Sequence, residues 1–394
     1  MSATRHNDLQ SVIAEATAGI EPHLVAIRRD LHAHPELGFE EVRTAGIVAA
    51  ELARLGIPHQ TGVGRTGVVG TITGGRPGPT LAIRADMDAL PIHEQTGLSF
   101  ASTAPGKMHA CGHDIHTSTL LGVAAVLQGM APSLSGTVRL LFQPAEETLG
   151  GAPAMIADGV MEGVDAALGF HNYPDRLVGS FSYARGACLA ASDRFDITVS
   201  GRSGHAAHPY DAVDPIVAAA HLVTQLQTVV SREQKPRHPC VVTVGAIHAG
   251  TVHNIIPDSC LIRGTVRTLH AQAQDVAEAA ISRLCAGLEV GMRVRCEVKY
   301  ERGVPALVND DAMLDRTVAS VRSQFGDVVE ESEPSMGGED FAFMAQLAPS
   351  AHLGVGSGQP GRHDKLHNSG YQPDEACIGL GVQALSRAAA DFLG

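Results

Sequence analysis

The sequence predicts an α/β protein in which a three-layer αβα domain is interrupted by an inserted, ferredoxin-like α+β domain. Between residues 80 and 170, short apolar runs bounded by turn residues alternate with helical patterns, as is typical of a sheet covered by helices on both faces. From about residue 186 the order becomes strand, helix, strand, strand, helix, strand, which is the split βαβ pattern. We therefore expect one domain from residues 1–185 and 303–394, and an insertion from residues 186–302.

The first domain begins with two predicted helices. Apolar residues recur at helical spacing over 8–34, where His34-Pro35 should end the helix, and over 45–55, which Gly56 and Pro58 follow. Strands are expected at 80–84, 137–142 and 166–170, with helices between them at 117–130 and 152–158. From about residue 304 the alternation of helix and strand returns, so this part should rejoin the first sheet.

The insertion has its own predicted elements. Strands are expected at 194–200, 240–247, 259–268 and 292–300, and helices at 213–230 and 271–288.

Composition excludes several classes of protein. The net charge of −13 argues against a nucleic-acid partner, because phosphate binding needs clustered Lys and Arg. No apolar run is long enough to predict a membrane span. Residues 1–29 are polar and amphipathic without an apolar signal core, so we expect a cytoplasmic protein. The seven cysteines are irregularly spaced and include no C-x-x-C pair, so no disulfide framework is expected.

A thiol and an imidazole stand two residues apart, shortly before the helix expected at 117–130. Gly112 separates Cys111 from His113, and glycine permits the sharp turn that lets both side chains converge on one ion. Thiolate and imidazole suit zinc and neighbouring transition metals. Taken alone, the pattern is more typical of a buried cysteine beside a capping histidine.

Acidic pairs follow two of the predicted strands. Asp86 and Asp88 come after the strand at 80–84, and Glu146 and Glu147 come after the strand at 137–142. Adjacent carboxylates repel each other, which is tolerable when one binds a cation and the other handles protons. The alternative is a solvated helix N-terminus, where glutamate is favoured.

Two further histidines lie at plausible sheet-edge positions. His171 follows the strand at 166–170, and His367 lies in a loop near the C-terminus. Ligands of open α/β sheets bind beyond the carboxyl ends of the strands. Together the motifs supply one thiolate, three imidazoles and a carboxylate.

Seven motifs occur in order, at residues 84–91, 108–114, 143–147, 204–209, 253–258, 337–341 and 366–368. This set resembles the hippurate hydrolase and auxin-conjugate hydrolase branch of the aminoacylase and carboxypeptidase-G-like metallohydrolases. The resemblance extends over nearly the whole chain, from residues 34–37 to Tyr371. It implies a metal-dependent amidohydrolase that cleaves small N-acyl amino acids to a carboxylic acid and an amino acid.

The resemblance also implies two divalent metal ions (Mn, Zn, Co or Ni) with five ligands: Cys111, His113, Glu147, His171 and His367. Glu146 takes the role of general base and then general acid toward a metal-activated water. Asp86 stands where the wider clan has the histidine of a His-x-Asp motif, which leaves open whether Asp86 or Asp88 contacts metal. We expect both to orient ligands through hydrogen bonds.

The resemblance implies that the insertion is a lid through which the protein forms a homodimer or a higher homo-oligomer. His205 is then expected to reach the active site of the partner subunit and to stabilise the oxyanion. Asn254 and Arg267 match positions associated with the substrate carboxylate. On the residues alone, His205 shaping a turn and Arg267 lying on a strand surface are open alternatives.

Three other functions stay open on the sequence. They are a dipeptidase or carboxypeptidase on the same scaffold, a non-catalytic metal- or ligand-binding protein, and a structural zinc site. Structural zinc sites are closed by four ligands, so five ligands and an additional acid favour an open two-metal site. The identity of the metal and of the acyl group does not follow from the sequence.

Overall fold

The computed structural model describes residues 2–394, with side chains from Asp8 onward, and divides into two compact units. Unit 1 runs to Gly186 and includes Val308–Glu333 and Asp340–Gly394, whereas unit 2 contains Ala187–Leu307 and Pro334–Glu339. The predicted α/β class with a ferredoxin-like insertion is confirmed. The N-terminal helix predicted at 8–34 is α1 (Ser2–Ala33), which begins earlier than predicted. Residue 1 and the side chains of residues 2–7, which belong to the segment that we interpret as lacking a signal core, lie outside the description.

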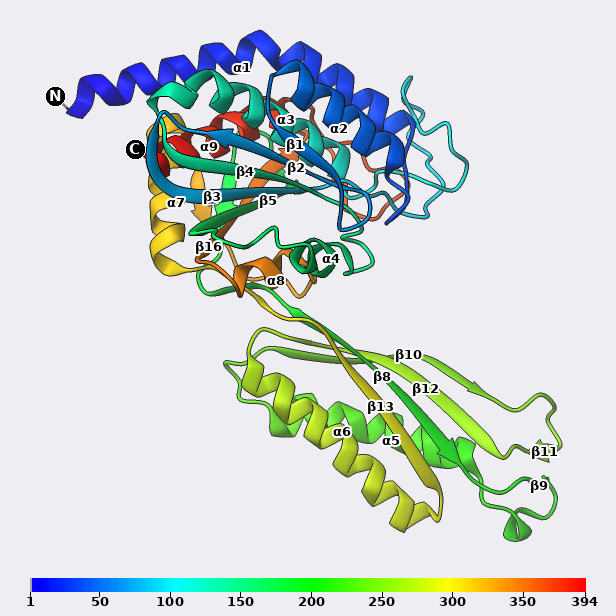
Figure 1. The fold of residues 1–394 in the computed structure, drawn as a ribbon. Coiled ribbons are helices and arrows are strands. Elements are labelled where there is room, and N and C mark those ends of the chain that lie inside the picture. Colours follow the sequence, from blue (N-terminus) through cyan, green and yellow to red (C-terminus); the bar gives the residue numbers. More distant parts are fainter. Residues whose placement is uncertain (1) are drawn as a thin grey trace. The chain divides into compact units, whose positions relative to one another are not determined.

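Unit 1 is built on a mixed sheet of eight strands in the order β1-β2-β4-β3-β5-β16-β6-β15 (Figure 1). Four neighbouring strands at its centre, β4, β3, β5 and β16, run parallel, so their carboxyl ends meet at one edge. The strands are β1 (His59–Val63), β2 (Gly67–Thr73), β3 (Arg76–Asp86), β4 (Ser135–Gln143), β5 (Ala166–Leu177), β6 (Phe181–Tyr183), β15 (Val329–Glu331) and β16 (Ser350–Gly358).

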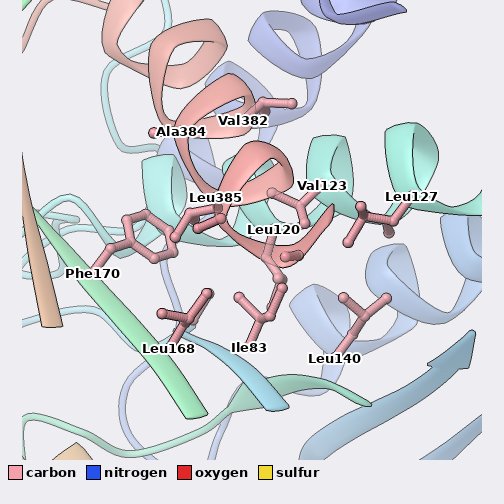
Figure 2. Close-up of a cluster of buried hydrophobic side chains, with 14 of the residues drawn as sticks. Ile83, Leu120, Val123, Leu127, Leu140, Leu168, Phe170, Val382, Ala384 and Leu385 are labelled. Carbon is pink, nitrogen blue, oxygen red and sulfur yellow. The ribbon is translucent and has the colours of Figure 1, made fainter. Parts of the chain in front are cut away.

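Helices cover both faces of this sheet, and Figure 1 shows α1, α2, α3 and α9 on one face and α4 and α8 on the other. The remaining helices of the unit, with their bounds, are α2 (Val42–Arg54), α3 (His113–Met130), α4 (Gly151–Ala157), α7 (Asp311–Phe325), α8 (Phe341–Ala345) and α9 (Ala376–Leu393), and a 3₁₀ turn spans Ala131–Ser133. Figure 2 shows the core between α3, α9 and the central strands, where Leu120 and Leu385 face Ile83 and Leu168. Burial on both faces explains why the central strands are almost continuously apolar.

Two parts of this sheet differ from the sequence prediction. The sequence prediction omitted the hairpin of β1 and β2, which pairs antiparallel with β4, although β2 carries the buried residues Val68, Val69 and Ile72. The predicted strand end at residue 170 is wrong, because β5 continues to Leu177. Its extension pairs with β16, where Tyr173 lies opposite Gly356, and its polar residues hid the strand. His171 therefore lies inside a strand.

Unit 2 is an antiparallel sheet of four strands in the order β10-β12-β8-β13, with two helices. This order and the antiparallel pairing of every neighbour are those of a ferredoxin-like domain. Its elements are β7 (Ala187–Leu189), β8 (Ala191–Ser200), β9 (Gly204–His205), α5 (Pro215–Thr228), β10 (Cys240–Ala249), β11 (Ile255–Ile256), β12 (Ser259–Thr268), α6 (Ala271–Met292), β13 (Arg295–Val304) and β14 (Leu307–Val308), with short helical turns at Pro209–Asp211 and Val229–Glu233.

A distant segment also belongs to unit 2. Residues 334–339 return to it, where Ser335 N–H donates to the Cys188 carbonyl (2.9 Å) and Ala190 N–H donates to the Gly337 carbonyl (2.8 Å). The segment carries no strand-like pattern of its own, so no local signal in the sequence indicated this return.

No helix in the described part of the chain is both long and apolar enough to cross a bilayer.

A buried carboxylate connects elements in the interior of unit 2 through hydrogen bonds. Asp193 on β8 is fully buried and accepts hydrogen bonds from Gln274 Nε2 (2.9 Å), the Tyr300 hydroxyl (2.6 Å) and Gly303 N–H (3.2 Å). It thus links α6 and β13 to the strand at the centre of the unit.

We expect Asp193→Ala to destabilise unit 2 by about 3 kcal/mol, because the donors lose their acceptor inside the protein. The measurement is urea unfolding followed by circular dichroism. Asp196→Ala is the matched control, because Asp196 lies on the same strand but is only half-buried and pairs with Arg263 (3.4 Å). The control should change the free energy of unfolding by less than about 1 kcal/mol. Equal losses in both variants would contradict the role given to Asp193.

Candidate metal centre

The central parallel strands bring the predicted motifs to one edge of the sheet of unit 1. β3 ends at Asp86 and β4 ends at Gln143, three residues before Glu146, while His171 lies on the neighbouring β5. α3 begins at His113 beside these strand ends. This is the position at which open α/β sheets bind ligands.

Gly112 sets the geometry of the thiol and imidazole. It has φ +89°, a left-handed conformation that L side chains rarely adopt, and it lies immediately before the first turn of α3. A Cβ at this position would lie 2.2 Å from Asn172 Nδ2 and 2.7 Å from the Tyr371 hydroxyl. The glycine between Cys111 and His113 thus provides both the turn and the room that it needs.

The structure brings together all five predicted ligands. Cys111 Sγ lies 3.3 Å from His171 Nε2, and His367 Nε2 lies 3.4 Å from Glu147 Oε1. Two triads have their ligand atoms within 4.8 Å of one another: Cys111 with His113 and His171, and Cys111 with Glu147 and His367. The thiol belongs to both triads, so it is placed to be shared by two ions.

Hydrogen bonds select which ring nitrogens are available to metal. His113 Nδ1 contacts Asp88 Oδ1 (3.3 Å) and His171 Nδ1 donates to the Asn172 carbonyl (2.7 Å), which leaves Nε2 of each ring facing the centre. His113 Nε2 and Glu147 Oε1 are buried and make no hydrogen bond within the described residues. Buried polar atoms are normally satisfied, so these two atoms and the soft and hard donors around them fit divalent cations.

The structure favours an orienting role for both aspartates, a choice that the sequence left open. Asp86 Oδ1 contacts His116 Nδ1 (2.5 Å) and Oδ2 accepts from Arg84 Nη1 (2.8 Å). Asp88 accepts the backbone N–H groups of Glu146 and Glu147 (3.0 Å each), in addition to its contact with His113. All four carboxylate oxygens are therefore engaged in holding the residues around the centre.

His116 is a site residue that the sequence analysis did not single out. Its ring stacks on that of His113 (5.4 Å between centroids) and lies edge-on to that of His171 (4.6 Å). Its Nε2 accepts hydrogen bonds from Asn172, so it is not available to a metal ion. The signal that could have found it is helical spacing, because His116 lies three residues after His113 on α3.

The protonation of the cluster reflects burial and a concentration of negative charge. Burial raises the pKa of the Cys111 thiol well above its ordinary value, although His113 lowers it. Burial lowers the pKa of His113, but Asp86 and Cys111 outweigh this effect and hold that pKa well above its ordinary value. A buried thiol becomes a thiolate when a cation coordinates it, so the donor set is complete only with metal.

Glu146 lies beside this centre. Its side chain is 7% exposed, and one of its carboxylate oxygens lies within 4.8 Å of the ligand atoms of His113 and Glu147. A carboxylate beside the five predicted ligands is placed to exchange protons with a molecule bound at this edge of the sheet.

The predicted residues of the insertion all lie in unit 2, but at two different places. His205 is exposed on β9 and lies near Asn254, whose carbonyl accepts the N–H of Ala206 (3.1 Å). Arg267 is half-buried near the far end of β12, where it pairs with Ser192 and Val241. At about 3.4 Å per residue, the eight steps from Ser259 to Arg267 span about 27 Å. One unit 2 therefore does not bring His205 and Arg267 together.

An α/β domain with a ferredoxin-like insertion and a thiol, imidazole and carboxylate cluster at its sheet edge is the architecture of a class of metallohydrolases. Residues 82–391 match the model described as "Peptidase family M20/M25/M40". The chain belongs to this family and is an enzyme of its amidohydrolase and peptidase type.

Named relatives have related activities. The chain is 39% identical to an N-acetyl-L-cysteine deacetylase of Bacillus subtilis (strain 168), over 95% of this chain and 90% of the relative. It is 37% identical to a hippurate hydrolase of Campylobacter jejuni, over 93% of this chain and 96% of the relative. Because the two identities are nearly equal, the comparisons support the family without selecting one acyl group.

A solved structure extends the likeness to the fold. It is the YXEP protein of Bacillus subtilis, described as a dinuclear metal-binding peptidase of the M20 family, with a TM-score of 0.86 and 35% identity. The match covers 95% of this chain and 99% of that chain.

Proposed function

We propose that the protein is a metal-dependent amidohydrolase that cleaves the amide bond of N-acyl amino acids, hippurate-like substrates among them. The observation that carries the proposal is the convergence of five side chains, from four separate segments of the chain, into two triads that share Cys111. The relatives named above, which are described as acting on N-acetylcysteine and hippurate, support the substrate class.

One ion would be held by Cys111, His113 and His171, and the other by Cys111, Glu147 and His367. This mixture of thiolate, imidazole and carboxylate suits manganese, zinc, cobalt or nickel. When bound, such ions polarise a carbonyl and lower the pKa of water from about 15.7 to about 7.

The chain itself supplies the proton transfers. Glu146 accepts the proton of the attacking water and then donates it to the departing amine, so it acts first as base and then as acid. Asp88 holds the backbone N–H groups of both glutamates, which fixes the position of Glu146 relative to Glu147. The products are a carboxylic acid and an amino acid.

The insertion would complete the site in a homodimer. We assign the oxyanion to His205 and the substrate carboxylate to Asn254 and Arg267. Because His205 and Asn254 lie near the start of β12 and Arg267 lies near its far end, these residues can act on one small substrate only if Arg267 comes from one chain and the other two come from its partner. This separation supports the expectation that His205 serves the site of the partner subunit.

Metal removal tests the proposal. Protein treated with a chelator should lose hydrolysis of hippurate and N-acetylcysteine, and added Mn²⁺, Zn²⁺, Co²⁺ or Ni²⁺ should restore it. Metal analysis should find two ions per chain. The same assays on free dipeptides distinguish the proposed amidohydrolase from a dipeptidase or carboxypeptidase on the same scaffold. Hydrolysis of N-acyl amino acids that survives complete metal removal, or hydrolysis of dipeptides alone, would contradict the proposed function.

A further inference from the structure

We infer that Asn172 is a positioning residue, whose single carboxamide joins three of the four chain segments that carry the proposed metal ligands. The inference rests on the proposed function, because it concerns how that metal centre is held. Asn172 follows His171 on β5, and its side chain is 1% exposed.

The amide nitrogen of Asn172 holds the segment that carries Cys111 and His113. Nδ2 donates to the Cys111 carbonyl (2.8 Å) and contacts His116 Nε2 (2.8 Å). The backbone N–H of Asn172 donates to the same ring nitrogen (3.0 Å). Because His116 Nδ1 faces the Asp86 carboxylate, Nδ1 carries the proton and Nε2 is an acceptor.

The amide oxygen of Asn172 holds the C-terminal loop and β16. Oδ1 accepts hydrogen bonds from the Tyr371 hydroxyl and from Ser357 Oγ (3.1 Å). Tyr371 lies four residues after His367, and its backbone N–H donates to the Asn368 carbonyl (3.1 Å), so its position is tied to the loop that carries His367.

The donors and acceptors around Asn172 match a carboxamide in one orientation. A carboxamide has two donor hydrogens and two acceptor lone pairs, and both pairs are engaged here. Aspartate has nearly the same shape, but it would present an oxygen to the Cys111 carbonyl and to His116 Nε2, both of which are acceptors. Gly112 packs directly against the Asn172 carboxamide, so position 112 has no room for a side chain.

The consequence is that one side chain sets the separation of ligands that are remote in sequence. Without the Asn172 carboxamide, the segments of Cys111, His171 and His367 lose the side chain that they share, and what remains are bonds between pairs of them, such as that from His367 N–H to the Ala110 carbonyl (2.8 Å). Loss of outer-shell partners typically lowers metal affinity by about 10–100-fold.

The test compares Asn172→Ala with Asn309→Ala. Asn309 is also a buried asparagine of unit 1, and its side chain donates to the Ala184 carbonyl (2.8 Å) and accepts from His352 N–H (2.7 Å), far in sequence from the ligands. Co²⁺ affinity is measured by chelator competition, and the thiolate-to-cobalt absorption band reports the position of Cys111. Urea unfolding of the metal-free proteins measures stability separately.

We expect Asn172→Ala to weaken Co²⁺ binding by about 10–100-fold and to shift or weaken the thiolate band. Asn309→Ala should lower stability but keep the wild-type affinity and band. Wild-type affinity and an unchanged band in Asn172→Ala would overturn the inference, as would an equal loss of affinity in Asn309→Ala. If the wild-type protein binds no Co²⁺, the proposed function fails instead.

Should Asn172→Ala not fold, Tyr371→Phe decides the question. It removes one hydroxyl from the amide oxygen and leaves the ring in place. We expect about tenfold weaker Co²⁺ binding, since the loop of His367 loses its bond to Asn172. Wild-type affinity in this variant would then overturn the inference.

Discussion

Glu146→Gln is expected to reduce kcat by about 10²–10⁴-fold while both metal ions stay bound. Glutamine keeps the size of the side chain but cannot accept the proton of the attacking water. The five proposed ligands are untouched, and Asp88 still holds the backbone of residue 146. The measurement pairs kcat for an N-acyl amino acid with the metal content of the same sample.

Two control variants distinguish a loss of proton transfer from a loss of metal. Glu147→Gln alters a proposed ligand, so it should lower metal content together with activity. Glu162→Gln changes a surface glutamate and should alter neither. If Glu146→Gln turned over at nearly the wild-type rate, the proton would have to pass through another group and the assignment of Glu146 would be wrong.

Cys111→Ala is expected to empty both ion positions, because its sulfur is the one ligand atom common to the two triads. The loss of affinity should exceed the roughly 100-fold that removal of an outer-shell partner costs. Metal analysis after dialysis measures this directly, and activity should fall with it. By contrast, His171→Ala and His367→Ala each remove a ligand from only one triad.

Cys188→Ala is the matched control for this prediction. Cys188 is a buried thiol whose pKa burial raises to about 12, and it lies in unit 2 with its Sγ near the Leu307 carbonyl (3.4 Å). It contributes to neither triad, so the variant should keep two ions. Retention of both ions by Cys111→Ala would show that the thiol is not the shared ligand.

The fold could be predicted where local pattern and tertiary burial agree. β3, β4 and the helices on them are continuous apolar or periodic segments, because the centre of the sheet is covered on both faces. β2 could have been predicted from its apolar residues Val68, Val69 and Ile72, whereas the extension of β5 could not, since its stability comes from pairing with β16 rather than from an apolar run. The return of residues 334–339 to unit 2 depends on backbone hydrogen bonds that leave no trace in composition.

By itself, the sequence determined the chemistry that the site can offer. Residue type marked thiol, imidazole and carboxylate side chains as candidate donors, because donor atoms are local properties, and the resemblance to a known family implied that Cys111, His113, Glu147, His171 and His367 are the ligands. Only the tertiary structure decided which atoms of these side chains face one another. It placed Cys111 in both triads, engaged every carboxylate oxygen of Asp86 and Asp88, and surrounded Asn172 with partners up to 199 residues away. Hydrogen-bond partners so remote along the chain are set by how the strands and helices pack, which no local pattern encodes.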